Sequence, residues 1–294
     1  MIKQLFNGHS SYIYCVKFSQ YYHYNNNRNV ICSSSNDKTI RFWDVKDNKQ
    51  LQIFKEHNSG ICSIKFSLFN SGQYLCSGSY DKTIRLWDIQ KYKSLHVFKG
   101  HTDTVWCVDI SSFQNNNNNF INGNGYTICS GSWDKTIRIW DIETTKQFIL
   151  FKGHNDWIRS VKYGSKELRN LIISGSQDKN ICLWDIRSGR QVQIFYGHKS
   201  SINDVEYSPF IVNNIEIGNI SNVICSCSWD NTIRFWDIRS NKNELYRMTG
   251  EDDGIFCIHF FQKMKKNEIK SDHYSDCGIN MCYGSNKGFI HIWG

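Results

Sequence analysis

The sequence predicts an all-β protein, a propeller of six four-stranded antiparallel blades. Three observations lead to this fold. A ten-residue segment ending in Trp-Asp occurs at residues 35–44, 79–88, 132–141, 176–185 and 228–237, and a degenerate sixth copy occupies residues 285–294. A Gly-His pair, or a variant of it, precedes each copy. The segments between these landmarks are short, rich in β-branched and aromatic residues and bounded by Asn, Asp, Ser and Gly, which is typical of strands.

The third repeat shows the elements in order. After Gly-His comes a strand at residues 105–110, then a variable loop and a strand at residues 126–130. A tight turn around Asp134 leads into a strand at residues 136–140, and residues 146–151 form the fourth strand before the next Gly-His. A four-stranded sheet of this size cannot bury both of its faces alone, so radial stacking of the sheets into a propeller is expected.

Length and composition set limits on function. The 294 residues are 40% apolar and 15% aromatic, enough for a sizeable core. A net charge of +8 is mildly basic, but no basic stripe or arm appears, so nucleic acid is an unlikely partner. No run approaches the roughly 20 apolar residues of a membrane span, and residues 1–8 do not form a signal peptide.

The twelve cysteines are expected to be reduced thiols. Cysteines recur at equivalent strand positions, just before the repeated serine, as small core residues do. These residues are Cys32, Cys76, Cys129 and Cys225. There is no Cys-x-x-Cys pair, so neither a metal nor another cofactor is predicted, and the location expected is intracellular, either cytoplasmic or nuclear.

The pattern Gly-His followed by Ser-x-Asp-x-Thr-Ile-Arg-x-Trp-Asp resembles the WD40-repeat family, whose members form G-beta-like propellers. The resemblance covers residues 1–294, which are expected to form a single domain. The sixth repeat ends after its third strand, and residues 2–6 resemble a fourth strand, so an N-terminal strand is expected to close the ring. The alternative is that the chain is a fragment of a longer or seven-bladed protein.

The insertions follow the first strand of their repeats and so fall on one rim. They occupy residues 20–29, 111–125, 209–222 and 262–276, and their asparagine runs are predicted to be disordered. No segment shows the helical period of 3.6 residues. The opposite rim, which carries the Gly-His loops and the Asp turns, is therefore the expected binding face.

Ser, His and Asp recur together in a way that could suggest a nucleophilic triad. An enzyme needs one such set in a cleft, whereas here five equivalent sets are distributed around the ring. The resemblance implies instead a buried structural network in each repeat, in which Trp donates to Ser, Ser to His and His to Asp. The sets are His9, Ser33, Asp37, Trp43; His57, Ser77, Asp81, Trp87; His101, Ser130, Asp134, Trp140; His154, Ser174, Asp178, Trp184; and His198, Ser226, Asp230, Trp236.

The sixth repeat loses this set. Glu251, Tyr283 and Lys287 stand at the His, Ser and Asp positions, while Trp293 remains. A Glu251–Lys287 salt bridge is expected in place of the network, and this blade is expected to be the weakest.

Aromatic residues outside the repeat signature map to the rim of the Gly-His loops and Asp turns. Such residues, together with arginine, are typical anchors of protein interfaces, although they could equally pack between blades near the channel mouth. The candidates are Tyr12, Tyr14, Tyr80, Trp106, Trp133, Trp157, Arg159, Trp229 and Phe256.

The predicted function is a non-catalytic scaffold or adaptor that presents a rigid face to protein or peptide partners within a larger complex. The alternative is an anion reader that binds phosphoinositide or nucleic acid through its basic surface. No unique catalytic site is apparent, so an enzyme is not predicted. The sequence indicates neither the identity of the partner nor the oligomeric state.

Overall fold

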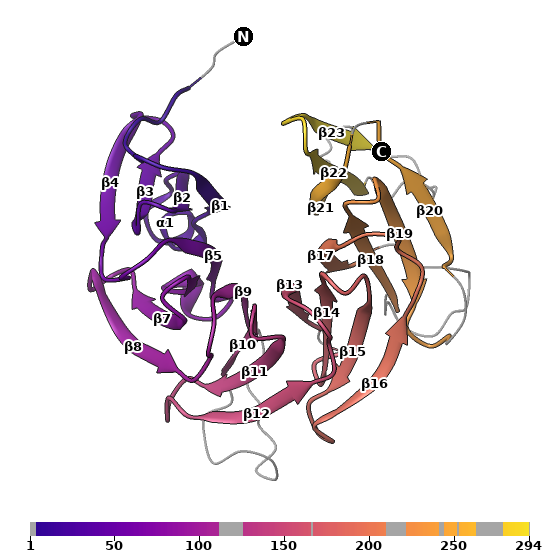
Figure 1. Ribbon diagram of the computed structural model, residues 1–294. Helices are drawn as coiled ribbons and strands as arrows, with labels where there is room; N and C mark the ends of the chain where they lie inside the picture. Colours follow the sequence, from indigo (N-terminus) through magenta and orange to yellow (C-terminus); the bar gives the residue numbers. More distant parts are fainter. Residues whose placement is uncertain are drawn as a thin grey trace, which may run out of the picture.

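Six antiparallel β-sheets stand around a common axis as the blades of a propeller (Figure 1). The computed structural model describes residues 4–111, 126–165, 167–209, 222–240, 244–251, 253–262 and 279–293. Five of the sheets have four strands, and the sixth has three within these residues. The prediction of an all-β, six-bladed propeller is confirmed.

Each blade is formed by consecutive strands, and the first strand is the innermost. Blade 1 contains β1 (Ile13–Phe18), β2 (Val30–Ser35), β3 (Ile40–Asp44) and β4 (Lys49–Phe54). Blade 2 contains β5 (Ile61–Phe66), β6 (Tyr74–Ser79), β7 (Thr83–Asp88) and β8 (Lys93–Lys99). Blade 3 contains β9 (Val105–Ile110), β10 (Thr127–Ser132), β11 (Thr136–Asp141) and β12 (Gln147–Lys152). Blade 4 contains β13 (Ile158–Tyr163), β14 (Leu171–Ser176), β15 (Ile181–Asp185) and β16 (Arg190–Phe195). Blade 5 contains β17 (Ile202–Tyr207), β18 (Val223–Ser228), β19 (Thr232–Asp237) and β20 (Tyr246–Thr249). Blade 6 contains β21 (Ile255–Gln262), β22 (Ile279–Ser285) and β23 (Ile290–Trp293).

Backbone hydrogen bonds bring the turn of each blade to its Gly-His loop. The amide of Tyr80, in the turn between β6 and β7, donates to the carbonyl of Gly60, just before β5, at 2.9 Å. The amide of Trp133 makes the equivalent bond to Thr104 at 3.0 Å. The loops and the turns therefore lie on one rim, which we call the turn rim.

The hydrophobic core consists of layers between neighbouring blades. Five clusters occupy the five interfaces from blade 1 to blade 6. In the first, Ile40 and Phe42 of blade 1 pack on Ile61, Ile64 and Phe66 of blade 2. All eleven cysteines in the described part of the chain are free, and most are buried in these layers.

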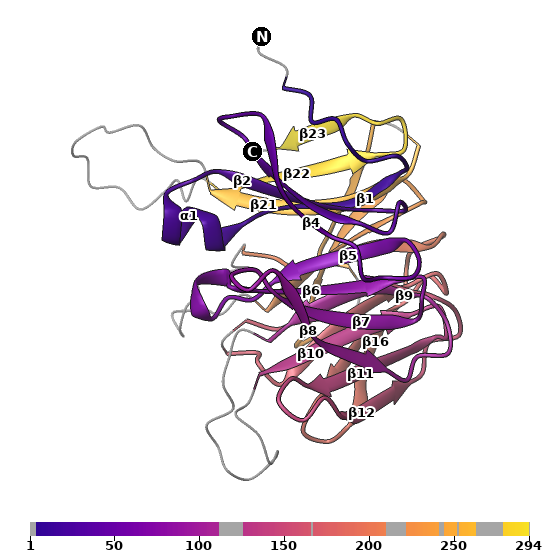
Figure 2. The same ribbon diagram turned by 90° about the vertical axis from the view of Figure 1, so that its left-hand side faces the viewer.

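A short helix was not predicted. Within the insertion at residues 20–29 lies α1 (Gln20–Asn26), which ends at Asn27 in the left-handed conformation, with φ of 50°. The prediction of disorder here was wrong because Tyr22 is 8% exposed and its ring packs on Phe42 at 6.0 Å, which anchors the helix. Figure 2 shows α1 at the rim opposite the turn rim, beside the connection that contains the 3₁₀ helix Asn70–Gly72.

The other three insertions lie largely outside the described residues, which resume at residues 126, 222 and 279.

The structure does not show the predicted closure of the ring by an N-terminal strand, of which residues 2 and 3 lie outside the described residues. Residues 4–8 form no strand. Gln4 instead donates from its side chain to the carbonyl of Val45 at 2.7 Å, and Phe6 packs on Trp43, so this segment follows blade 1 rather than β23. The six blades consequently form an open arc, with blade 1 and blade 6 at its two ends (Figure 1).

Candidate partner-binding rim

A buried hydrogen-bond chain connects the strands of blade 2. The indole N–H of Trp87 donates to Ser77 Oγ at 2.8 Å, and Ser77 Oγ lies 2.7 Å from His57 Nε2. His57 Nδ1 is 2.8 Å from Asp81, whose carboxylate also accepts the backbone N–H of Asn58 at 2.9 Å. Because the indole occupies one lone pair of the serine oxygen, the serine proton is directed to histidine and the histidine N–H to aspartate.

The same chain of bonds occurs in four other blades. In each, the distances from Trp to Ser, Ser to His and His to Asp are between 2.7 and 3.0 Å. The residues are Trp43, Ser33, His9 and Asp37; Trp140, Ser130, His101 and Asp134; Trp184, Ser174, His154 and Asp178; and Trp236, Ser226, His198 and Asp230.

The protonation of these groups suits a structural role. Burial lowers the pKa of His57, which favours the neutral ring. Burial acts to raise the pKa of the Asp81 carboxyl, but hydrogen bonds from His57 and Thr83 outweigh it and hold this pKa well below its usual range. The serine hydroxyl is fully buried, so no substrate reaches it. The repeated triads therefore join turn to strand within a blade.

Blade 6 replaces the chain of bonds with other contacts. The Glu251 carboxylate lies 3.7 Å from Nδ1 of His291. The predicted Glu251–Lys287 salt bridge stays a prediction. The His291 ring stacks on Tyr283 at 4.7 Å with an interplanar angle of 15°. One contact between the exposed Glu251 and the partly buried His291, and one ring contact, stand where the other blades have a buried network.

Three tryptophans form a continuous stack on the turn rim. The Trp133 ring lies nearly parallel to that of Trp157 in the next blade, with centroids 4.2 Å apart and an angle of 8°. Trp133 also stacks on Trp106, at 5.5 Å and 22°. All three are half-buried. The rings thus pack between blades and still present part of their surface to solvent.

Two tyrosines and an arginine extend this stack. Tyr80 meets Trp106 edge-on at 6.2 Å, and Tyr14 of blade 1 meets Trp106 at 5.9 Å. The Arg159 guanidinium lies over the Trp106 ring at 5.6 Å and contacts Gln177. Within the described residues no carboxylate lies within 4 Å of Arg159. We call Tyr14, Tyr80, Trp106, Trp133, Trp157 and Arg159 the rim cluster.

The other candidates lie outside this cluster. Trp229 and Phe256 form a separate edge-on pair at 4.8 Å between blades 5 and 6, where they are 37% and 40% exposed. Tyr12 is 78% exposed at the entry to β1. The candidate set therefore divides into one continuous cluster, one pair and one isolated side chain.

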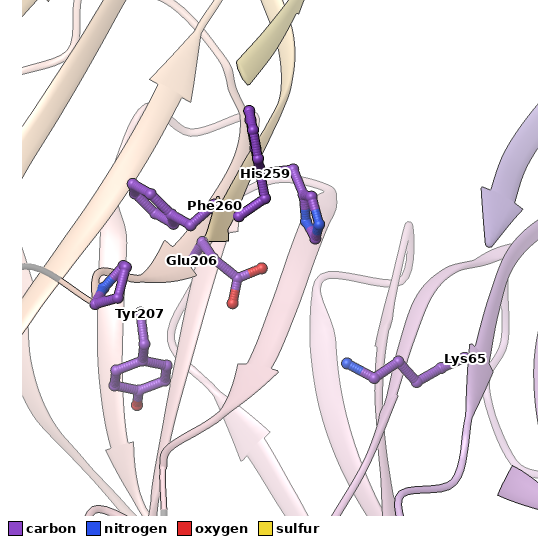
Figure 3. Close-up of a pocket in the computed structure, with 7 residues that line it drawn as sticks. Lys65, Glu206, Tyr207, His259 and Phe260 are labelled. Atoms are coloured by element: carbon purple, nitrogen blue, oxygen red, sulfur yellow. The ribbon is translucent and has the colours of Figure 1, made fainter. Parts of the chain in front are cut away.

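Sequence reasoning missed a ring of polar residues that lines the channel. One position of each innermost strand carries it, and the residues are Lys17, Lys65, Asp109, Lys162, Glu206 and His259. Lys65 pairs with Asp109 at 2.8 Å and Lys162 with Glu206 at 2.6 Å. Asp109 beside Lys65 raises the pKa of its ammonium group. Figure 3 shows Lys65 facing Glu206 and His259 across a pocket of about 430 Å³.

The described residues contain no group of three or more His, Cys, Asp or Glu side chains that could hold a metal ion. Among them, no helix has the length and apolar character required to cross a membrane.

Comparison with known families agrees with this architecture. The family model "WD domain, G-beta repeat" matches residues 2–44, 48–88, 92–141, 145–185 and 189–237. The chain belongs to the WD40-repeat family. The matched segments end before the sixth, degenerate repeat, which is also the blade without the buried network.

Several known proteins are similar to this chain over part of their length. Cell division control protein 4 of Saccharomyces cerevisiae is 28% identical over 172 residues, which are 55% of this chain and 21% of that protein. Histone acetyltransferase type B subunit 2 of Candida glabrata is 34% identical over 140 residues, 46% of this chain and 31% of that protein. Nuclear distribution protein PAC1-2 of Postia placenta is 44% identical over 39 residues, which are 13% of this chain and 9% of that protein. The chain therefore spans less than a third of the length of each of these relatives.

Proposed function

We propose that the protein is a non-catalytic scaffold that binds a protein or peptide partner on the turn rim, with the rim cluster as its main anchor. The stack of Trp106, Trp133 and Trp157 is the observation that carries the proposal. Tryptophan, tyrosine and arginine supply most of the binding energy in protein interfaces. In this cluster they are contiguous and remain partly exposed.

The surroundings of the cluster favour tight binding. Its side chains come from blades 1 to 4, and each of these blades is held by a buried hydrogen-bond network. The rings constrain one another by stacking, so a partner loses little of its binding energy to ordering them. Arg159, which has no carboxylate within 4 Å among the described residues, adds a cation that an acidic side chain of a partner could meet.

The proposal also includes the cell compartment in which the protein acts and the complex to which it belongs. The protein acts inside the cell, in the cytoplasm or nucleus, as a subunit of a larger complex. The free cysteines support the location, because disulfides rarely form there. One relative bears the name of a subunit of an acetyltransferase, which supports a role within a complex.

The test selects peptides from a random display library on the immobilised 294-residue chain. Selected peptides are then titrated against the wild type and against a variant with Trp106→Ala, Trp157→Ala and Trp229→Ala. We expect affinity to fall by at least about tenfold, since each anchor contributes roughly 1 kcal/mol or more. Tyr24→Ala is the matched control, because Tyr24 is 68% exposed on α1 at the opposite rim.

Circular dichroism and urea unfolding establish that the triple variant is folded. A folded triple variant that binds every selected peptide as well as the wild type contradicts the proposal. Binding of phosphoinositide vesicles or of a single-stranded oligonucleotide, weakened steeply by added salt and indifferent to the tryptophans, would favour the anion reader instead.

A further inference from the structure

A second pocket, of about 380 Å³, lies between blades 2 and 3. Blade 2 contributes residues of the connection between β5 and β6 and of β6 to β8, and blade 3 contributes Tyr126, Asp141 and the two residues after it. Figure 2 shows that the connection between β5 and β6 lies at the rim opposite the turn rim. The pocket is therefore separate from the rim cluster, and it is large enough to hold a side chain or a small molecule.

Asp141 lines this pocket with a carboxylate oxygen that has no hydrogen-bond partner in the described chain. The residue is only 3% exposed, and its Oδ1 accepts the backbone N–H of Thr144 at 2.6 Å. Its Oδ2 is buried and accepts no hydrogen bond. A buried carboxylate oxygen without a donor is unfavourable, so a ligand that donates to it would be bound more tightly.

The chain itself supplies a donor to this oxygen in the four other blades that have the aspartate. In blades 1 and 5 the donor is an arginine guanidinium, at 2.6 Å and 2.8 Å. Blade 2 uses a side-chain amide at 3.2 Å, and blade 4 uses a backbone N–H at 3.3 Å. The donors are Arg28 for Asp44, Gln73 for Asp88, Ser188 for Asp185 and Arg239 for Asp237.

Blade 3 has an aromatic ring in place of the donor. In blade 2 the donor, Gln73, is the residue just before β6, and its carbonyl accepts the N–H of the residue after the aspartate. Tyr126 makes the same backbone contact in blade 3 and so occupies the equivalent position. Its ring stacks on Phe69 of blade 2 at 3.7 Å and 22°, and Phe69 also contacts Tyr74 at 5.8 Å. All three rings line the pocket beside Asp141.

The charges around the pocket favour a cation. The described residues that line it include a second carboxylate, Glu143, and one histidine, His96, but no lysine or arginine. The insertion that precedes Tyr126 in the sequence, residues 111–125, contains neither lysine nor arginine. A cation that meets Asp141 would therefore come from a ligand.

We propose that this pocket binds a guanidinium group on an apolar stem, as in an arginine side chain. The guanidinium donates to Asp141 Oδ2, in the manner of Arg28 and Asp44 in blade 1. Its planar faces pack on the aromatic rings, which attract a cation and match a flat group. The methylene stem contacts Leu86 and Leu95, which also line the pocket.

The test titrates the isotope-labelled 294-residue chain with the peptide acetyl-Gly-Arg-Gly-amide and follows the backbone amide chemical shifts by NMR. We expect saturable shifts at Tyr74 and Ile142, which lie at the pocket. The same peptide with citrulline in place of arginine is the ligand control, because its side chain has nearly the same shape and no charge. It should bind at least about tenfold more weakly, since it makes no charge-assisted hydrogen bond.

A further ligand distinguishes two sources of the guanidinium. Butylguanidinium carries the stem and the cation without a peptide backbone. Equal affinities of butylguanidinium and the arginine peptide would assign the pocket to free guanidinium compounds. Tighter binding of the peptide would assign it to an arginine of a partner polypeptide.

Three variants test the role of the carboxylate. Asp141→Asn retains an oxygen for the Thr144 N–H but removes the charge, so affinity for the arginine peptide should fall by about tenfold or more. Tyr126→Gln places in blade 3 the donor that Gln73 is in blade 2, and it should also weaken binding. Asp185→Asn is the matched control in blade 4 and should bind like the wild type, because that carboxylate is outside the pocket and its Oδ2 already accepts a backbone N–H.

Circular dichroism establishes that each variant is folded. The proposal is overturned if arginine and citrulline peptides bind equally, if the wild type shows no shifts at Tyr74 and Ile142, or if a folded Asp141→Asn variant binds like the wild type. It is also overturned if Asp185→Asn weakens binding as much as Asp141→Asn does. Should Asp141→Asn not fold, the wild-type shifts and the comparison with citrulline decide.

Discussion

Adjacent serines in β2 allow a direct test of the buried network. Ser33 Oγ accepts the indole N–H of Trp43 at 2.8 Å and lies 2.7 Å from His9 Nε2. Ser34 is fully buried in the same strand, yet its Oγ has no hydrogen-bond partner in the described part of the chain. Ser33→Ala leaves two buried groups unsatisfied at about 1–3 kcal/mol each, and should therefore lower the free energy of unfolding by about 2–6 kcal/mol. Ser34→Ala removes a hydroxyl that bonds to nothing and should be neutral or slightly stabilising.

Urea unfolding followed by tryptophan fluorescence measures both variants. The two substitutions remove the same atom from neighbouring buried positions, so the difference between their midpoints isolates the hydrogen bonds from the loss of packing. Equal slopes with denaturant would justify comparing the midpoints as stabilities. The reasoning is refuted if Ser34→Ala shifts the midpoint as far as Ser33→Ala, or if Ser33→Ala leaves it unchanged.

Three more predictions concern acid, α1 and blade 6. Burial lowers the pKa of His101, so stability should decrease as pH falls through the unfolded-state value of about 6.5; a urea midpoint that is flat between neutral pH and about pH 5 would contradict this. Burial acts to raise the pKa of Asp134, but hydrogen bonds from His101 and Thr136 outweigh it, so the pKa is lowered. A second loss of stability should therefore follow as the pH falls below about 4. Tyr22→Ala should cost about 2–4 kcal/mol of unfolding free energy, whereas the exposed neighbour Tyr24→Ala should cost almost nothing in the same urea assay. Amides of β21 to β23 should exchange with deuterium faster than those of β9 to β12, and equal protection of the two blades would contradict the assignment of blade 6 as the weakest.

The fold was predictable because its signal is repeated. Each copy of the Ser-x-Asp to Trp-Asp segment specifies a strand, a turn and a second strand, and six copies in one register determine six blades around a common axis. The turn rim also followed from the sequence, since the histidine of the loop must reach the aspartate of the turn. The same argument places Trp133 and Trp157 on that rim.

Other features depend on contacts that the repeat pattern does not encode. Trp133 stacks on Trp157 only because neighbouring blades are rotated so that the turn of one meets the loop of the next. The helix α1 forms in a polar insertion because one tyrosine reaches the core of blade 1, whereas the asparagines around it suggested disorder. The polar residues that line the channel were not predicted because they differ in charge, although they occupy one position in every innermost strand.

Blades 1 and 6 show the separate effects of two sources of stability, the buried hydrogen-bond network within a blade and the apolar clusters between blades. Blade 1 has one uncovered face but keeps its buried network, from Trp43 to Asp37. Blade 6 has an uncovered face, only three strands in the described chain, and Glu251 and Tyr283 in place of the network residues. The network operates within a blade and joins its turn to its loop, while the apolar clusters operate between blades. Any excess opening of blade 6 over blade 1 therefore reflects the missing network and fourth strand rather than the uncovered face, which the two blades share.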